Sequence, residues 1–222
     1  MKYSKIFSEQ ELQDQRDKWT AIGLATGASD FSKAESAAKA AYKQAGLAEP
    51  RFIRTGSPEA AVKAATSLTE SGEKDVYNQV SNQVSSQVYS QVWRQVSSQV
   101  WRQVYNQVYD QVSSQVWRQV YGQVYSQVYN QVFNYYYRSS QLARLTMFRD
   151  IEEVKQLDCF VSLAESTGMY LLLNKTVIFS ERPDRIVFRG TGQQKKAVLI
   201  EYPDGLTVTS LSPLEQLATA AE

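Results

Sequence analysis

The chain has 222 residues, of which 43% are hydrophobic and 21% are charged, so it is long and apolar enough to fold around a core. Its 24 basic and 23 acidic residues leave a net charge of +1, which provides no field to attract nucleic acid or an anionic membrane. Histidine is absent and Cys159 is the only cysteine, which excludes an internal disulfide, a CxxC zinc site and any triad or metal centre built on histidine.

Residues 1–72 are predicted to form an N-terminal helical domain. Three helix starts carry capping signals, and these are Ser8 with Glu11, Ser32 with Glu35, and Ser57 before Pro58. Gly46 is expected to end the second helix, and the third is expected to reach about Leu68. The sequence from Met1 to Trp19 has no apolar run typical of a signal peptide, and no window is apolar enough to span a membrane. Together with the single cysteine, these features predict a cytoplasmic protein that does not enter a membrane.

Residues 73–138 form a second predicted domain, in which a four-residue repeat runs without interruption from Val76 to Asn134. The unit is Val, then Tyr, Trp, Phe or Ser, then a small polar residue or Arg, then Gln, and it supplies fifteen evenly spaced valines and fourteen glutamines. Four residues of α-helix advance about 400°, so a valine stripe would drift about 40° per unit. Ala, Leu, Glu, Lys and Met are absent from the repeat, whereas Val and aromatic residues favour sheets.

A second period of sixteen residues supports a coiled architecture. Residues 97–112 and 113–128 differ at only two positions, Asn106/Gly122 and Asp110/Ser126. We therefore predict a four-sided β-solenoid with one tetrapeptide per side, in which valines point inward and the neighbouring rings point outward. The alternatives are a long α-helix or helical pair, and a disordered segment. Duplication of a gene segment would produce the same period whatever the fold.

Residues 139–222 are predicted to form one helix, from Ser139 to Leu157, followed by an antiparallel β-meander. Five alternating segments bounded by turn residues indicate its strands, which are Met169–Leu173, Thr176–Ser180, Arg185–Phe188, Lys196–Tyr202 and Leu206–Leu211. A short tail follows from Pro213. The predicted fold class is thus α+β, with a central β-solenoid whose open ends are covered by the helical cap and the meander.

Motifs near both ends of the chain carry a family resemblance. They are Trp19, Ala37–Tyr42, Ala45–Leu47, Pro50 and Ser57-Pro58, and then Ser180–Pro183 and Tyr202–Gly205. With the QV tetrapeptides between them, the chain resembles the uncharacterised bacterial DUF6745 family, whose members commonly carry QV- or QL-based arrays. It departs from the family pattern by lacking a histidine between the strands at Arg185 and Lys196. The family has no assigned activity, so the resemblance implies an architecture and supplies no catalytic residue.

The sequence predicts no enzyme, no cofactor and no metal. Cys159 lies in an apolar stretch without a histidine that could activate it, which favours a buried structural residue. The Gly190-Thr191-Gly192 segment is followed by no helical pattern, so it does not fit a dinucleotide or phosphate loop. No pattern places two carboxylates in one cleft.

The variable positions of the array instead indicate binding. They use the Tyr, Trp, Ser, Asn, Gly and Arg of antibody paratopes, and Trp, Tyr and Arg are the usual hot-spot residues of protein interfaces. We therefore predict an array surface for a protein partner or for a second copy of the chain, as in a homo-oligomer. Its predicted binding residues are Trp93, Arg94, Trp101, Arg102, Trp117, Arg118, Tyr89, Tyr105 and Tyr121.

Two alternative roles for these rings remain open. They could stack only to stabilise the coil, or they could stack on the bases of a nucleic acid. The array offers three arginines against one aspartate, which is too little positive charge for strong phosphate binding and argues against nucleic acid.

Overall fold

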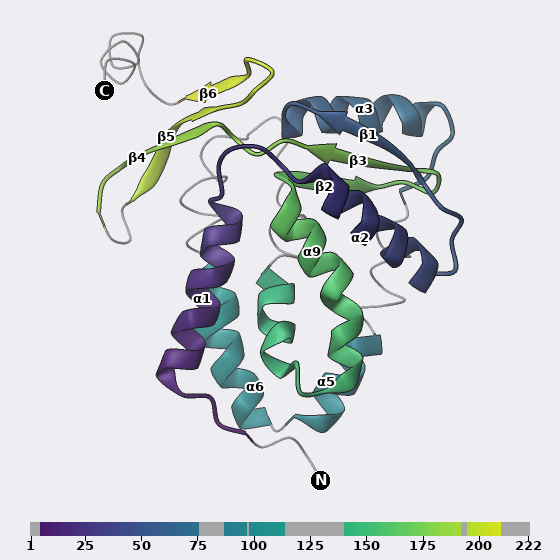
Figure 1. Ribbon diagram of the computed structural model, residues 1–222. Coiled ribbons are helices and arrows are strands. Elements are labelled where there is room, and N and C mark those ends of the chain that lie inside the picture. Colours follow the sequence, from purple (N-terminus) through teal and green to yellow (C-terminus); the bar gives the residue numbers. More distant parts are fainter. Residues whose placement is uncertain (1–4, 76–86, 97, 114–139, 192–194, 210–222) are drawn as a thin grey trace.

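The N-terminal helices begin where short polar side chains cap them. The computed structural model describes residues 5–75, 87–96, 98–113, 140–191 and 195–209 (Figure 1). α1 (Glu9–Gly23) opens with the predicted capping box of Ser8 and Glu11. α3 (Pro58–Glu70) opens with the predicted cap at Ser57, whose hydroxyl accepts a hydrogen bond from the Ala60 N–H. Both predictions are confirmed.

The cap predicted for the second helix is wrong by two residues. α2 (Phe31–Gln44) is capped by Asp30, whose carboxylate accepts a hydrogen bond from the Lys33 N–H, and Ser32 lies inside the helix. The helix ends as predicted, because Gly46 takes a left-handed conformation with φ of 68° after the last turn.

The first sheet joins distant parts of the chain. β1 (Arg51–Thr55) runs parallel to β3 (Thr176–Ser180), and β2 (Met169–Leu172) pairs with β3 in the antiparallel direction. α3 packs along this sheet, while α2 and α9 (Asp158–Ser166) lie on its other side (Figure 1). All five residues of the central strand β3 are buried. The N-terminal segment therefore contributes an edge strand as well as helices.

The predicted single β-meander is wrong, although its strands occur where the sequence indicated them. β4 (Arg185–Arg189), β5 (Lys196–Glu201) and β6 (Thr207–Thr209) form a separate antiparallel sheet. β3 does not join this sheet, because β1 and β2 occupy its two edges. The predicted tail from Pro213 lies outside the described residues.

The remaining elements are helical and lie below the first sheet in Figure 1. The array supplies α5 (Gln87–Gln95), α6 (Ser98–Val104), the π-helical turn η2 (Tyr105–Tyr109) and α7 (Asp110–Val112). In place of one helix from Ser139 to Leu157, the chain forms a helical segment at 140–145 and two 3₁₀ turns, η4 (Thr146–Phe148) and η5 (Glu152–Leu157). α1 packs against η2 and α7, and α5 packs against η5.

The β-solenoid prediction is wrong, because residues 87–95 and 98–112 are helical. Predicted array residues 76–86, 97 and 114–138 lie outside the described part of the chain. Seven array valines, Val88, Val92, Val96, Val100, Val104, Val108 and Val112, are buried in the common core. Burying each one contributes about 1.5 kcal/mol or more, whereas poor helix formers cost about 0.5 kcal/mol each. Tertiary packing thus outweighs the unfavourable helix propensity.

The expected drift of the valine stripe is limited by the kind of helix that forms. An α-helical turn has fewer than four residues, so successive valines of α6 rotate in one direction around the helix axis. A π-helical turn has more than four residues, so successive valines of η2 rotate in the opposite direction. The short length of α5 and α6, and the interruption between them at Val96, also prevent the drift from accumulating. A four-residue repeat can therefore keep one buried face in a helical fold.

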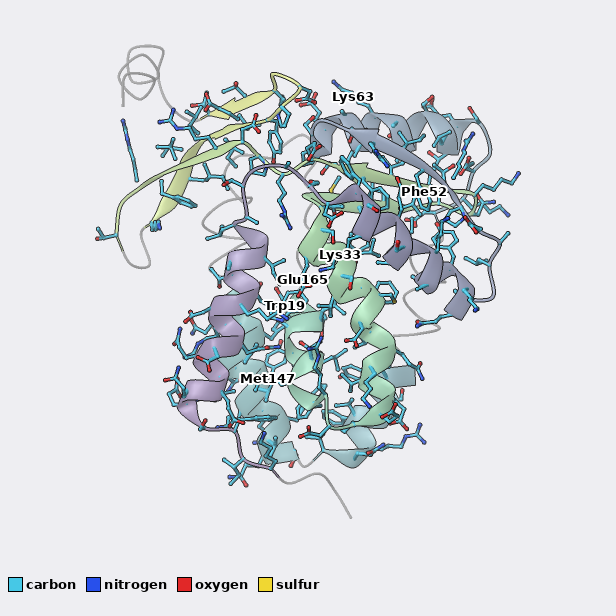
Figure 2. The ribbon with its side chains drawn as sticks, in the orientation of Figure 1. Trp19, Lys33, Phe52, Lys63, Met147 and Glu165 are labelled. Carbon is cyan, nitrogen blue, oxygen red and sulfur yellow. The ribbon has the colours of Figure 1, made fainter. Side chains whose placement is uncertain are left out.

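An ion-pair cluster connects three helices. Glu165 of α9 lies 3.1 Å from Nζ of Lys18 in α1 and 3.1 Å from Nζ of Lys33 in α2, and Figure 2 shows Lys33 and Glu165 close together between their helices. Burial by itself raises the pKa of Glu165. The hydrogen bonds from Lys18 and Lys33 together lower the pKa by more than burial raises it, so the net shift is downward. Because the pKa is lower in the folded chain, the cluster stabilises the fold above the ordinary pKa of a glutamate, which is about 4.3.

Glu165→Gln is expected to lower the free energy of unfolding by about 1 kcal/mol at pH 7. The difference from the unmodified chain should start to shrink as the pH falls below about 4.3, and it should vanish only below the lower pKa that Glu165 has in the folded chain, where the residue is protonated in both states. Urea unfolding at pH 7 and at low pH measures this. Glu59→Gln is the control, because the ion pair of Glu59 with Lys63 joins two residues one turn apart in α3 and does not connect different helices. A loss from Glu165→Gln that is independent of pH would contradict the electrostatic explanation.

Candidate aromatic binding surface

The rings of the array divide into an exposed group and a buried group. Trp93 is 51% exposed, Tyr89 is 41% exposed and Tyr105 is 37% exposed, whereas Trp101 and Tyr109 are buried. The prediction that the rings point outward is therefore wrong for Trp101 and Tyr109. We use the name aromatic surface for Tyr89, Trp93 and Tyr105. These three residues lie on α5 and at the start of η2.

The aromatic surface is continuous with the core of the protein. The rings of Tyr89 and Trp93 stack with their centroids 6.4 Å apart, and each meets the ring of Trp101 edge-on at 5.3 Å. Trp101 in turn stacks on Phe148 at 5.9 Å, and Phe148 is fully buried and meets Phe7 at 5.7 Å. The exposed rings thus sit on a rigid support, which lowers the conformational entropy that they would lose on binding.

A buried arginine lies at the centre of the ring cluster. The guanidinium carbon of Arg144 is 4.5 Å from the centroid of Trp101, 5.6 Å from Tyr89, 5.2 Å from Tyr105 and 5.3 Å from Tyr109. Arg144 is only 3% exposed, so these cation–π contacts act in a largely water-free environment where they are strongest. It also donates a hydrogen bond to Oε1 of Gln141. We name Arg144 and its four rings the arginine cage.

The sequence analysis did not find Arg144. A signal for it was present, because Arg144 is the only charged residue in the apolar run from Leu142 to Phe148. A lone arginine among apolar residues of a helix is a candidate for burial with a specific partner. What the sequence could not indicate is that the partner would be rings from the array.

The predicted arginines of the array lie apart from this cage. Arg94 and Arg102 are exposed, and Nε of Arg94 donates a hydrogen bond of 3.1 Å to the Ser90 carbonyl in its own helix. Trp117, Arg118 and Tyr121 lie outside the described residues, and their predicted role in binding stays a prediction.

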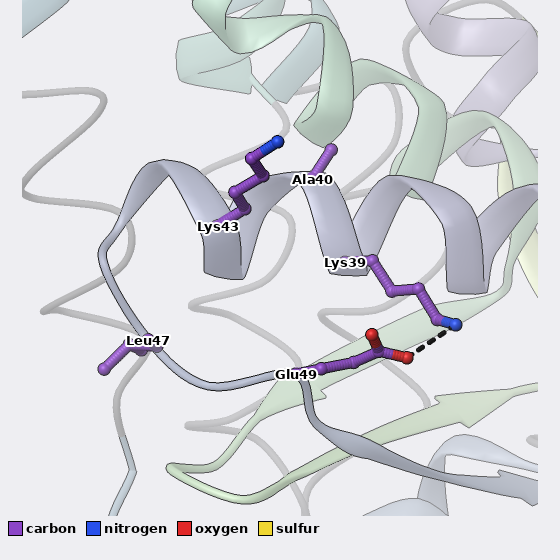
Figure 3. Close-up of a pocket in the computed structure, with 5 residues that line it drawn as sticks. All are labelled: Lys39, Ala40, Lys43, Leu47 and Glu49. Carbon is purple, nitrogen blue, oxygen red and sulfur yellow. Dashed lines mark ion pairs between the residues drawn. The ribbon is translucent and has the colours of Figure 1, made fainter.

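A separate hollow lies beside the end of α2, with a volume of about 390 Å³ (Figure 3). Its lining consists of Lys39, Ala40, Lys43, Leu47 and Glu49. Nζ of Lys39 lies 2.6 Å from Glu49, and this hydrogen bond raises the pKa of Lys39. Lys39 therefore stays protonated near neutral pH and cannot act as a general base there.

The single cysteine is placed where it cannot act as a nucleophile at neutral pH. Cys159 is buried at the start of α9, and this burial raises the pKa of its thiol to about 12. Among the described residues, no group of three acidic or cysteine side chains is arranged to hold a metal ion. The same part of the chain contains no helix with the length and apolar character needed to cross a membrane.

Comparison with known proteins finds no match to this chain, whether among family models, curated proteins or solved structures. The resemblance to the DUF6745 family therefore stays a prediction.

Proposed function

We propose that this protein is a non-catalytic interaction module that binds a protein partner through its aromatic surface. The observation that supports this best is the exposure of Trp93 and Tyr89 on top of the buried Trp101. Large rings that are exposed in the free protein and held in place by the core are the usual anchors of protein interfaces.

The surroundings of the rings indicate the chemistry of the partner. Arg94 and Arg102 are exposed and directly follow Trp93 and Trp101 in the chain. A partner with an apolar or aromatic side chain flanked by carboxylates would match this combination of rings and positive charge. The buried Trp101 and Tyr109 have a structural role instead, so the two predicted roles of the rings belong to different residues. Because the chain has one buried cysteine and no partner for a disulfide, we also propose that it works in the reducing cytoplasm.

The proposal predicts that Tyr89→Ser with Trp93→Ser abolishes binding without unfolding the protein. Immobilised full-length chain would first be used to capture proteins from a cell extract, and a captured protein would then be purified and titrated calorimetrically. The double variant should bind it at least about thirtyfold more weakly, as expected for the loss of a hot spot. Its melting temperature should fall by no more than about 8 °C, because both rings are already partly hydrated and Tyr89 is the farthest of the four rings from Arg144.

Ile6→Ser is the matched control, because Ile6 is an apolar residue outside the array that is 69% exposed. This variant should bind as the unmodified chain does. If every captured protein binds the ring variant and the control equally well, the proposal is wrong. Binding of single-stranded DNA at low salt through the same rings would support the nucleic-acid alternative instead. Sedimentation at two protein concentrations separates binding of another protein from self-association.

A further inference from the structure

Residues 98–112 of the array occupy a surface built from parts of the chain on both sides of the array. Nε2 of Gln103 donates a hydrogen bond of 3.0 Å to the Phe7 carbonyl, and Arg16 of α1 donates one of 3.3 Å to the Gln107 carbonyl. Trp101 stacks on Phe148, and Arg144 enters the cage. We name α1 with residues 5–8 and 140–148 the docking surface. It recognises the array through one tryptophan, two tyrosines, a glutamine side chain and a valine stripe.

The next sixteen residues of the sequence carry the same recognition elements. Segment 113–128 keeps every residue of 97–112 that contacts the docking surface, and these counterparts are Trp117, Gln119, Tyr121, Gln123 and Tyr125. The two segments differ only where Asn106 becomes Gly122 and Asp110 becomes Ser126. Asn106 and Asp110 are both exposed. The docking surface therefore has no buried contact by which it could distinguish the two copies.

The match extends to all five described rings of the array, and among shifts of up to sixteen residues in either direction it holds for one only. Moving the chain forward by sixteen residues replaces Tyr89, Trp93, Trp101, Tyr105 and Tyr109 by Tyr105, Tyr109, Trp117, Tyr121 and Tyr125. Shifts of four, eight or twelve residues in either direction, and a shift of sixteen backward, each put serine in at least one ring position. The forward shift also keeps all seven buried valine positions as valine.

We propose that the docking surface is a binding site for the sixteen-residue repeat and that it accepts either residues 97–112 or residues 113–128 of its own chain. We call these two placements the first and the second register, and the structure shows the first. The second places Tyr109 where Trp93 is displayed now, so the exchange also changes the aromatic surface. Eleven residues would remain between Val128 and Ser140, and an extended chain of that length can reach about 35 Å. Extra residues in the preceding connection cost little, because loop-closure entropy grows slowly with length.

The test is a double-mutant cycle on the two tryptophans, measured as the folding equilibrium constant from urea unfolding of the full chain. Trp117→Ser should change the constant no more than about twofold, since Trp101 fills this place on the docking surface in the first register. Trp101→Ser should lower it less than tenfold, because Trp117 can take the vacated place. The double variant should lose on the order of a hundredfold or more, the usual result of removing a buried tryptophan.

A single register would give a different pattern. Trp101→Ser alone would then cause the full loss, and adding Trp117→Ser would change nothing further. This outcome would overturn the proposal. Phe148→Ala is the matched control, because both registers use Phe148 and neither copy can replace it. Phe148→Ala should lower the folding equilibrium constant on the order of a hundredfold or more, whether it is made in the unmodified chain or together with either tryptophan substitution.

Hydrogen exchange with mass spectrometry gives a second readout, because it locates the protected amides in the sequence in addition to reporting how stable they are. In Trp101→Ser, the slowly exchanging amides should move from residues 98–112 to residues 114–128, and peptides from the two copies differ in mass at Asn106/Gly122 and Asp110/Ser126. Slow exchange that stays at 98–112 would overturn the proposal. So would a stability of Trp101→Ser that rises with protein concentration, because the replacing repeat would then come from another chain.

Discussion

Replacing Arg144 with alanine is expected to lower the free energy of unfolding by about 3 kcal/mol or more. The change removes a buried cation from contact with four rings, and such contacts contribute about 2 kcal/mol or more when they are shielded from water. It also leaves a cavity between the array and residues 140–148, which adds to the loss. Both proposed registers of the array use Arg144, so neither can compensate.

Urea unfolding followed by tryptophan fluorescence measures this change. Arg149→Ala is the control, since Arg149 is a nearby arginine that is half exposed and pairs with Asp158 at 3.0 Å. Its loss should cost no more than about 1 kcal/mol. Arg144→Leu separates the two causes, because leucine refills much of the space without restoring the charge. If Arg144→Ala is as mild as Arg149→Ala, the arginine cage has no energetic importance.

Gly168→Ala is expected to destabilise the first sheet by about 3 kcal/mol or more. Gly168 immediately precedes β2, and its N–H donates a hydrogen bond of 3.0 Å to the Ser180 carbonyl. A methyl group at this glycine would overlap the backbone carbonyl of Glu181. That backbone cannot move aside easily, because the Glu181 N–H is bonded to the Thr55 carbonyl at 2.8 Å. The close approach of two backbones, rather than backbone conformation, therefore requires glycine.

Gly72→Ala is the matched control for this substitution. Gly72 has a φ of 94°, but no atom lies within 4 Å of the place where its methyl group would go. Alanine there should cost only the strain of a left-handed conformation, about 1 kcal/mol. Thermal unfolding of both variants should place Gly168→Ala clearly below Gly72→Ala. The reverse order would contradict the packing explanation.

The two proposals rest on different rings of the array and can fail separately. Binding depends on Tyr89 and Trp93, which are exposed, and it requires no change of register. Register exchange depends on Trp101 and Trp117 and would occur without any partner. A protein that binds through Trp93 in a single fixed register would support the first proposal and overturn the second.

Several elements could be predicted from the sequence because their signals are local. The capping box at Ser8 and the cap at Ser57 involve residues within one helical turn. Strands such as β3 and β5 were visible as short apolar segments between turn residues. β1 was missed because it is short and carries Arg51 and Arg54 at a sheet edge, so its composition does not resemble that of a buried strand.

The secondary structure of the array could not be predicted from its repeat. Its four-residue period matches neither the 3.6 residues of an α-helix nor the two-residue alternation of a strand, and its composition favours strands. The burial of Val88, Val104 and the other array valines was predicted correctly, but burial alone does not distinguish a solenoid from a helix. The arginine cage was not predicted, since Arg144 gains its contacts from rings more than thirty residues earlier in the chain.

Local signals in the sequence were sufficient to locate the starts of α1 and α3, the strands β2 to β6 and the apolar stripe of the array, since each of these is encoded within a few neighbouring residues. The tertiary structure was needed to learn that residues 87–95 and 98–112 are helical, that β1 pairs with β3, and that Trp101 is buried while Trp93 is exposed. The reason is physical. The free energy that decides these points comes from apolar surface buried between segments that are far apart in the chain, and it exceeds the local preferences of the residues involved.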